Sequence, residues 1–551
     1  MIANINIHEK SFGPKILYKD LSMQLQPKEK VGLIGRNGTG KTTLFHMLTG
    51  DDTDFSGEVQ FRKNLITIAS RQEHQAFEDT PVLEYILADL PHYASLKHIL
   101  DTYPATMGDS VSKMNKYGDA LEQFSSLGYY QVEGEIAESL RQYQLSEAQI
   151  NGTIGTLSGG QKRFVELVKV QHANAELVLI DEPTNHMDYV AKDSFIEWFK
   201  REQAAVLVIT HDRDVLREVD RIIEIRDGRA LSFTGNYDEY LKTNTNKIVS
   251  EVNEYEVTQS RITNLKSDVL RFQRMKEKAR DPGTIQRFKS LEQKARAELA
   301  ELQKLEKPSF WIDQESLQGL NDKLTSSYDA HKARNIKVRM KSKQESGSRL
   351  LIEAHELSLG YEAPLFDSVS FQLREGERIR LHGRNGAGKT SLIRAVLSQA
   401  AGEALPLTKY AGHIMSEKEL KIGVYEQEIS AHLLDVKLYD AIEQVLLDKG
   451  VKANDTRIRQ LMSDYLFNPM SDGEITLDRL SGGQKARYQL IKMLADDPQI
   501  LILDEPTNHL DLPSIEELEN ALQQYNGAVI YVSHDSYFAD KLHGAEVRIG
   551  Q

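Results

Sequence analysis

Two eight-residue stretches decide the fold: GRNGTGKT at residues 35–42 and GRNGAGKT at residues 383–390. Each follows a short apolar run, Val31–Ile34 in the first case and Ile379–Leu381 in the second, where Arg380 interrupts the apolar pattern. Each also precedes a helical pattern, which is the context in which a GxxxxGK[ST] stretch forms a phosphate-binding loop. The sequence therefore predicts two α/β domains that bind a nucleoside triphosphate.

The residue types in both loops fit phosphate binding. Glycines let backbone amides converge on phosphate oxygens, and the following helix N-terminus adds partial positive charge. Lys41 or Lys389 would reach the β- and γ-phosphates, and the hydroxyl of Thr42 or Thr390 would ligate Mg²⁺. The predicted ATP-binding residues of the two loops are Gly35, Arg36, Asn37, Gly38, Thr39, Gly40, Lys41, Thr42 and Thr43, and Gly383, Arg384, Asn385, Gly386, Ala387, Gly388, Lys389, Thr390 and Ser391.

The two loops belong to a longer internal repeat. LSGGQ at residues 157–161 recurs at 480–484, and DEPTNH at 181–186 recurs at 504–509, both with an offset of 323 residues. Self-similarity of this kind indicates two homologous domains in one chain.

The spacing of the copies differs only between the phosphate loop and LSGGQ. The loops are 348 residues apart and the later motifs 323, so the first copy holds 25 extra residues. We place this arm-like insertion at about Pro91–Leu127 (residues 91–127) and expect it to be helical. The expected organisation is a first domain at 1–240, a charged helical linker at 241–348 and a second domain at 349–551.

The linker has the composition of a helical hairpin. Residues 247–307 are rich in Glu, Lys, Arg, Gln and Ala, with one strong turn signal, Asp-Pro-Gly at 281–283. Apolar residues recur at heptad-like spacing on both sides of this turn. A helix pair that lies flat on the two domains is the alternative. A second linker portion, His331–Lys343, holds six Lys or Arg residues and no acid.

Charge is unevenly distributed. The chain carries 82 acidic and 68 basic residues, a net charge of −14, which argues against broad coating of nucleic acid. Near the predicted turn, seven basic residues face only Glu277 and Asp281. A solvated helix face would explain this cluster equally well, but it also fits RNA phosphates. The candidate RNA-binding residues are Arg271, Arg274, Lys276, Lys278, Arg280, Arg287 and Lys289.

Composition excludes several classes of protein. Cysteine is absent, which rules out disulfide scaffolds, thiol nucleophiles and cysteine zinc sites, and fits a reducing compartment, so we expect a cytoplasmic protein. The longest apolar runs, such as Ala204–Ile209, are far shorter than the roughly 20 residues of a spanning helix. We therefore expect no membrane partner.

Each DEPTNH motif follows an apolar run typical of a buried parallel strand, Leu177–Ile180 or Ile500–Leu503. Such strands end at the sheet edge where ligands bind in open α/β folds. One carboxylate of each pair would hold Mg²⁺ and the other would polarise the attacking water. The predicted metal ligands are Asp181 and Asp504, and the predicted catalytic carboxylates are Glu182 and Glu505.

A histidine follows the next apolar strand in each copy. His211 comes after Val206–Thr210 and His534 after Val529–Ser533, again 323 residues apart. Each could contact the γ-phosphate and sense its loss. A histidine that merely satisfies a sheet edge is the alternative, but the repeated spacing favours a catalytic role.

LSGGQ adds a second set of phosphate donors to a domain whose lysine already holds a nucleotide. We therefore expect these donors to bind the ATP held by another domain. Here the sequence resembles the ABC ATPases, in which two nucleotide domains face head to tail and sandwich two ATP molecules. The resemblance implies one site from Lys41, Thr42, Gln72, Asp181, Glu182 and His211 with Ser481, Gly482, Gly483 and Gln484, and a second from Lys389, Thr390, Gln427, Asp504, Glu505 and His534 with Ser158, Gly159, Gly160 and Gln161.

The same resemblance assigns four further positions. Gln72 and Gln427 match the Q-loop glutamines of the family, which add to the metal shell. Phe12 and Tyr361 look like the aromatics that stack on adenine, although β-core aromatics would read the same way.

Within the ABC ATPases, the chain resembles the ABC-F family of ATPases that act on ribosomes. The features are tandem domains, a charged helical linker and Glu-Pro-Thr-Asn-His in both copies, followed by Met187 in place of the usual leucine in the first. The resemblance implies a ribosome partner, with the linker near P-site transfer RNA and the 23S RNA of the peptidyl-transferase region, and the arm near the ribosomal stalk. It also implies a monomer with intramolecular domain pairing.

Alternatives remain at the level of function. An importer ATPase subunit also fuses two ABC domains, but lacks a long helical connector. DNA-repair ABC ATPases carry zinc-cysteine modules or very long coiled coils that this sequence lacks. A translation role and antibiotic protection of the ribosome both stay open, and the short turn at Asp281–Thr284 favours the former.

Overall fold

The computed structural model describes residues 1–13, 15–71, 74–106, 108, 110–185, 187–303, 336–337, 349–405, 407–417, 420–426 and 429–550. These residues form two compact units, one made of Met1–Tyr237 with Ile336–Gln551 and the other of Asp238–Asn335. Gln72, Gln427 and most of His331–Lys343 lie outside the described residues.

The first copy of the repeat is built on a six-stranded sheet. Its order is β5 (Thr67–Ala69), β6 (Leu177–Asp181), β7 (Ala205–Ile209), β3 (Lys30–Gly35), β8 (Arg221–Arg226) and β9 (Arg229–Thr234). All neighbours are parallel except β8 and β9. Every residue of β6 and β7 is buried, which is why these strands read as continuous apolar runs.

A smaller antiparallel sheet packs beside it, in the order β2 (Lys15–Leu25), β1 (Ala3–Phe12) and β4 (Ser56–Phe61). Side chains of this sheet share one apolar core with β3 and with α1 (Lys41–Thr49), the helix that follows the phosphate loop. The other helices are α2 (Val82–Asp89), α3 (Tyr93–Thr106), α4 (Val111–Ser126), α5 (Val132–Gln142), α6 (Glu147–Ile150), α7 (Gly159–His172), α8 (Tyr189–Arg201) and α9 (Arg213–Leu216). The segment at 91–127 thus contains α3 and α4.

The second copy repeats this plan without that insertion. Its main sheet is all parallel in the order β14 (Ile422–Tyr425), β15 (Ile500–Asp504), β16 (Ala528–Val532), β12 (Arg378–His382) and β17 (Ala545–Arg548). Its small sheet is β11 (Pro364–Arg374), β10 (Leu350–Gly360) and β13 (Thr408–Ser416). Its helices are α14 (Lys389–Ala401), α15 (Leu438–Asp448), α16 (Asp455–Asp464), α17 (Gly482–Leu494), α18 (Leu512–Gln524) and α19 (Ser536–Leu542).

The strands predicted before the phosphate loops, the Asp-Glu pairs and the histidines are confirmed. Arg380, which interrupts the pattern of β12, donates from its guanidinium to the carbonyl of Ser533 at 3.0 Å. A charged residue fits inside this parallel strand because a main-chain carbonyl at the end of the neighbouring strand accepts its hydrogen bond.

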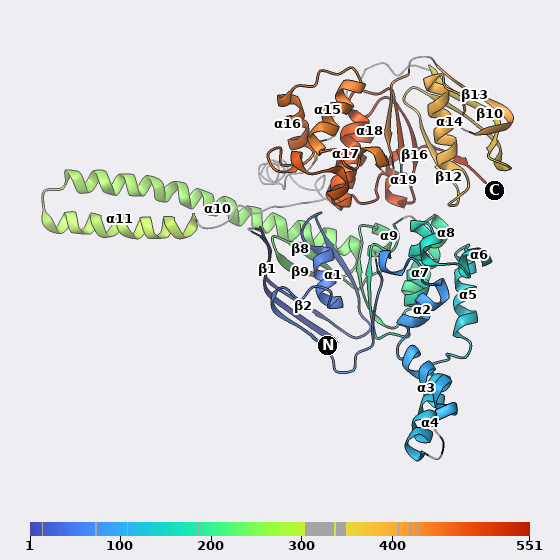
Figure 1. Ribbon diagram of the computed structural model, residues 1–551. Coiled ribbons are helices and arrows are strands. Elements are labelled where there is room, and N and C mark those ends of the chain that lie inside the picture. The colour runs from blue at the N-terminus through green and yellow to red at the C-terminus, as the bar shows by residue number, and fades with distance from the viewer. Residues whose placement is uncertain are drawn as a thin grey trace. The chain divides into compact units, whose positions relative to one another are not determined.

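The second unit is the predicted helical hairpin (Figure 1). The described part of this unit comprises α10 (Tyr237–Lys278) and α11 (Pro282–Leu302), which run side by side. Asp281 caps α11 by accepting from the Thr284 amide at 2.8 Å, and Pro282 occupies the first turn. At 1.5 Å per residue, α10 is about 63 Å long.

The two helices are joined along one side. Ile262, Leu265 and Ala295 are buried between them, as the heptad spacing predicts. Two ion pairs flank this seam, Arg261 with Glu298 at 2.8 Å and Lys276 with Glu292 at 2.6 Å. No described helix is both long and apolar enough to cross a lipid bilayer.

Leu179 in β6 is fully buried, whereas Leu447 in α15 is mostly exposed. We expect Leu179→Ala to lower the free energy of unfolding by about 2–5 kcal/mol, because it leaves a cavity in the main sheet. Leu447→Ala removes the same atoms from a solvated surface and should change it by less than about 0.5 kcal/mol. Urea unfolding followed by circular dichroism checks both. If both variants shifted the midpoint of urea unfolding equally, the burial assigned to β6 would be contradicted.

Candidate nucleotide-binding and hydrolysis sites

The phosphate loops have a backbone that only glycine adopts without strain. Gly38 and Gly40 have φ of 80° and 99°, and Gly386 and Gly388 have 81° and 96°. A Cβ on Gly40 would overlap the hydroxyl of Tyr18, which donates a hydrogen bond to the Gly40 carbonyl. The glycine positions of both loops therefore place no side chain between the backbone and a ligand.

The loop lysines lie over their own loops. Lys41 Nζ donates to the carbonyls of Gly35 at 2.8 Å and Arg36 at 3.3 Å. Lys389 makes the equivalent bonds to Gly383 and Arg384 at 2.7 and 2.9 Å. Burial lowers the pKa of both lysines, although nearby carboxylates oppose this effect. Each loop thus holds a buried cation beside its amide groups, as phosphate binding requires.

A hydroxyl and a carboxylate lie together at the end of each central strand. Thr42 Oγ1 is 3.4 Å from Asp181 Oδ2, and Thr390 Oγ1 is 3.1 Å from Asp504 Oδ2. Burial raises the pKa of Asp181 to about 6 and also raises that of Asp504, although nearby cations, among them Lys41 and Lys389, oppose the shift. These hard oxygen donors fit Mg²⁺. Within the described residues no cluster of three His, Cys, Asp or Glu side chains holds a metal, so phosphate or water would complete the shell.

The two carboxylates predicted to be catalytic have strained backbones. Glu182 and Glu505 have φ of 46° and 50°, which is unfavourable for residues with a Cβ. Bonds from their amides to the neighbouring strands, at 2.8 Å to Ile209 and 3.0 Å to Val532, hold them there. Burial, with the adjacent aspartate, raises the pKa of Glu182 to about 8 and that of Glu505 to about 7. Both values suit a group that exchanges a proton near neutral pH.

The two histidines face these carboxylates. His211 Nε2 is 3.8 Å from Glu182 Oε1, and His534 Nε2 is 3.3 Å from Glu505 Oε1. Burial lowers the pKa of both histidines to about 3, so both rings are neutral. Within the described part of the chain, both ring nitrogens of His211 lack a hydrogen-bond partner, and so does Nδ1 of His534. Unsatisfied buried rings of this kind point towards a missing ligand.

The phosphate loop of each copy is bonded to the other copy. The Asn37 amide donates to Asp511 Oδ2 at 2.9 Å, and its side chain donates to the His509 carbonyl at 3.0 Å. The Asn385 amide donates to Asp188 Oδ2 at 3.0 Å. The sequence reasoning assigned no role to Asp188 or Asp511, although their recurrence at the end of both DEPTNH-x-Asp runs was a visible signal.

The LSGGQ turns open helices α7 and α17. Ser158 and Ser481 are their N-caps, and Gln161 and Gln484 bond back to the serine amides at 2.9 and 3.0 Å. The two glutamines, predicted to bind ATP, therefore shape the turn. A Cβ on Gly483 would overlap the Asn37 side chain, so this turn lies against the phosphate loop of the first copy.

Both predicted adenine-stacking aromatics are exposed at strand ends. Phe12 and Tyr361 have exposed fractions of 56% and 58%, so neither is a core residue. Lys10 Nζ lies 4.9 Å from the centre of the Phe12 ring. Gln72 and Gln427 cannot be placed in this geometry because they lie outside the described residues.

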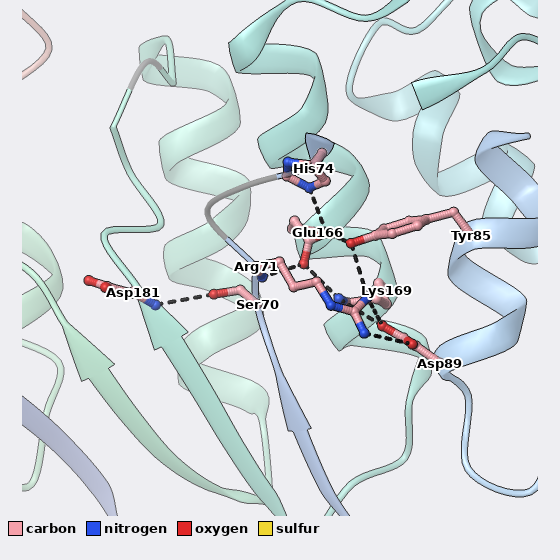
Figure 2. Close-up of polar contacts among 8 residues, drawn as sticks. All are labelled: Ser70, Arg71, His74, Tyr85, Asp89, Glu166, Lys169 and Asp181. Carbon is pink, nitrogen blue, oxygen red and sulfur yellow. Dashed lines mark hydrogen bonds and ion pairs between the residues drawn. The ribbon is translucent and has the colours of Figure 1, made fainter. Parts of the chain in front are cut away.

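A buried polar cluster in the first copy was not predicted (Figure 2). Glu166 of α7 accepts from the Arg71 amide at 2.7 Å and from the Tyr85 hydroxyl, and it lies 2.9 Å from His74 and 2.7 Å from Lys169. In the same strand connection, Ser70 Oγ accepts from the Asp181 amide at 3.2 Å. The cluster therefore joins α7 to the segment that leaves β5 beside the candidate metal ligand.

Comparison with known proteins identifies relatives over nearly the whole length. A family model described as ABC transporter matches residues 18–185 and 366–508. The probable ATP-binding protein YheS of Escherichia coli O6:H1 is 30% identical, covering 95% of this chain and 75% of its own. ABC transporter F family member 5 of Arabidopsis thaliana is 26% identical, covering 97% and 72%.

Two further comparisons concern ribosome protection and fold. The ribosome protection protein VmlR of Bacillus subtilis is 26% identical, covering 97% of this chain and 84% of its own. The solved structure of an RNase-L inhibitor aligns with a TM-score of 0.56 at 17% identity, covering 99% and 90%. At that identity the structural likeness concerns the fold alone.

Glu166→Gln should destabilise the protein, because it removes the anion that compensates Lys169. Burial raises the pKa of Glu166, but Lys169 and three hydrogen bonds outweigh it and lower that pKa to about 2. A lowered pKa stabilises the fold fully above about pH 4.5, on the order of 3 kcal/mol, and this stabilisation is lost as pH falls towards 2. The difference between wild type and variant should thus be constant at pH 5–7 and shrink below about pH 4.

Urea unfolding across this pH range provides the measurement. Glu84→Gln, on the exposed side of α2, makes the same chemical change as a control and should shift the free energy of unfolding by less than about 0.5 kcal/mol. A difference for Glu166→Gln that grows as the pH falls would contradict the ionised state of the Glu166 carboxyl.

Proposed function

Because this chain belongs to the ABC family of ATPases and, within it, to the ABC-F group, we propose that it acts on the ribosome and couples ATP binding and hydrolysis to the position of its helical hairpin. Its two ABC domains bind and hydrolyse ATP. The observation that carries the proposal is the reciprocal bonding of each phosphate loop to the other domain, through Asp511 to Asn37 and through Asp188 to Asn385.

Two composite sites follow from this pairing. In the first, Lys41, Thr42, Asp181, Glu182 and His211 would act with the LSGGQ turn of the second domain. In the second, the matching residues of the second domain would act with Ser158 and Gly159. Contact of Gly483 with Asn37 supports the first assignment, because it brings an LSGGQ turn to a phosphate loop of the opposite domain.

Different residues of each site would bind the phosphates, hold Mg²⁺ and activate the water. The loop amides and the lysine bind the β- and γ-phosphates, and Thr42 with Asp181 or Thr390 with Asp504 would hold Mg²⁺. When bound, the ion would offset charge on the phosphate oxygens. Glu182 and Glu505 would orient the water and take its proton, and the neutral imidazoles of His211 and His534 would hydrogen-bond the γ-phosphate.

The hairpin is the segment that would meet RNA. Arg271, Arg274, Lys278, Arg280, Arg287 and Lys289 are exposed around its tip, whereas Lys276 is held by Glu292. A basic tip on an acidic protein binds phosphate locally without coating the surface. We propose that the tip contacts transfer RNA and 23S RNA at the peptidyl-transferase region. The name of VmlR, a ribosome protection protein, supports a ribosomal partner.

Only three residues separate α10 from α11, so the hairpin has no extended tip loop. Because members of the family that confer antibiotic resistance tend to carry such an extension, we favour a general role in translation. We also propose that the protein works as a cytoplasmic monomer, since each composite site is completed within one chain.

Glu182→Gln with Glu505→Gln should trap the protein on ribosomes. Glutamine keeps the side-chain volume but cannot take a proton, so ATP stays bound and the domains stay closed. We expect co-sedimentation with purified ribosomes in ATP to rise at least tenfold over wild type, while hydrolysis falls to background. The same variant with ADP is the control and should remain in the supernatant. If the same amount of the variant co-sedimented with ribosomes in ATP, in ADP and without nucleotide, the proposal would be wrong.

Arg280→Ala with Arg287→Ala tests the hairpin tip. If both arginines contact phosphates, their loss should lower the slope of log affinity against log salt by roughly 1.4 to 1.8. The matched control is Lys63→Ala with Arg457→Ala, two exposed cations outside the hairpin, which should leave the slope unchanged. Ribosome binding by the trapped variant, measured at several salt concentrations, supplies the slopes. A change of the same size in the control would show that only net charge matters.

A further inference from the structure

Both candidate hydrolysis centres open into one internal cavity of about 40 Å³. Most of its lining comes in pairs that the 323-residue offset relates, so the two halves of the cavity are nearly equivalent. The identical pairs are Glu182 with Glu505, Thr184 with Thr507, Asn185 with Asn508, His211 with His534, and Asp212 with Asp535.

Among the positions that line the cavity in both copies, one pair differs in chemistry. Lys192 of α8 lines the cavity on one side, and the offset places Ile515 of α18 on the other. Both side chains are buried, with exposed fractions of 5% and 1%. A buried ammonium group in place of an alkyl group is a large chemical difference between two otherwise similar centres.

Lys192 is held by groups from both copies. Its Nζ is 2.9 Å from Asp212 and 2.6 Å from Asp214, which flank the start of α9 just after His211. The same Nζ donates across the seam to the main-chain carbonyl of His534 at 3.2 Å. Ser536 of the second copy also donates to Asp214, at 2.7 Å. The lysine therefore ties the segment after His211 to the backbone of His534.

We propose that Lys192 is a positioning residue for the second hydrolysis centre, where it fixes the backbone of His534 and so keeps that imidazole against Glu505. At the first centre Ile515 carries no donor, and the segment after His211 is held across the seam by a different contact, from Arg213 to Glu519 Oε1 at 2.8 Å. The ring-to-carboxylate distances differ in the same direction, at 3.3 Å for His534 to Glu505 and 3.8 Å for His211 to Glu182. The inference rests on the proposed catalytic roles of these residues and not on the ribosome.

If Lys192 supports only the second centre, the two centres should respond differently to its loss. A positioned side chain raises the rate of the chemical step without adding to substrate binding, because misplacement of a reacting group by about 1 Å can reduce the rate a hundredfold. Loss of Lys192 should therefore slow hydrolysis at the second centre and leave its affinity for ATP unchanged. The first centre should keep both its rate and its affinity.

A single-turnover experiment on the full chain tests this. Protein saturated with radiolabelled ATP is mixed with Mg²⁺ and excess unlabelled ATP, and labelled ADP is counted by quenched flow. With Lys192→Ile, one of the two labelled ADP molecules per protein should form about tenfold more slowly and the other at its wild-type rate. Equal slowing of both, or slowing of neither, would overturn the proposal.

Single-centre backgrounds identify which centre is affected. With Glu182→Gln, only the second centre is active, and adding Lys192→Ile should slow its labelled ADP about tenfold with an unchanged ATP affinity. With Glu505→Gln, only the first is active, and Lys192→Ile should leave its rate within twofold. The reverse pattern would contradict the assignment. Ribosome binding enters neither assay, so failure here is separate from failure of the ribosomal role.

Two variants separate positioning from folding. Lys192→Ile with Asp214→Asn also removes one of the anions left without a counter-ion, and the Asn oxygen still accepts from Ser536, so it should fold and show the same selective slowing. Lys192→Arg keeps a donor and should restore at least part of the rate. Lys200→Ile, an exposed lysine of the same helix, should leave both ADP phases unchanged. Slowing by Lys200→Ile as large as that of Lys192→Ile would overturn the proposal.

Discussion

The two carboxylates that cap α8 and α18 hold the nucleotide sites together. Each accepts from one amide in the first turn of its own helix, Asp188 from Ala191 and Asp511 from Ser514. Each also accepts from an amide in the opposite domain, Asp188 from Asn385 and Asp511 from Asn37. A carboxylate with donors on both oxygens makes strong, directional bonds. Each aspartate thus fixes, with one carboxylate, the start of a helix in its own domain and the phosphate loop of the opposite domain. A movement of one domain therefore also displaces the phosphate loop of the other.

Sequence periodicity and motif spacing were sufficient for the fold. The parallel strands could be predicted because both of their faces are buried and the runs are apolar throughout. The hairpin followed from Asp281 and Pro282, which stop one helix and start the next. The composite sites stay a prediction from the second set of phosphate donors in LSGGQ. The contacts across the seam could not be predicted, since the distance from Asp511 to Asn37 depends on how two domains pack.

Other features left no pattern in a single sequence. Glu166 and Lys169 occupy one helix three residues apart, which reads as an ordinary surface ion pair. Only tertiary packing buries both and adds the Tyr85 hydroxyl and the Arg71 amide. Gln161 is predicted from its place in LSGGQ to bind ATP, and the structure adds a role in a capping box that the motif alone did not indicate. A sequence motif can point to a candidate residue, but the groups that the residue contacts in the folded protein determine its role.

Buried positions differ in polarity between the copies in both directions. The offset of 323 sets the fully buried Glu519 of the second copy against Ile196 of the first. Three buried polar side chains of the first copy have less polar counterparts in the second: the offset of 348 sets Phe366 against Tyr18, and the offset of 323 sets Gln489 against Glu166 and Ile515 against Lys192. In each case the polar group of the first copy bonds to a loop or turn that borders a nucleotide site. A buried polar network fixes one geometry, whereas apolar packing tolerates small shifts. We therefore expect two centres built on one plan to differ in how tightly their predicted catalytic groups are held, with the asymmetry in the supporting residues while the predicted reacting groups are the same.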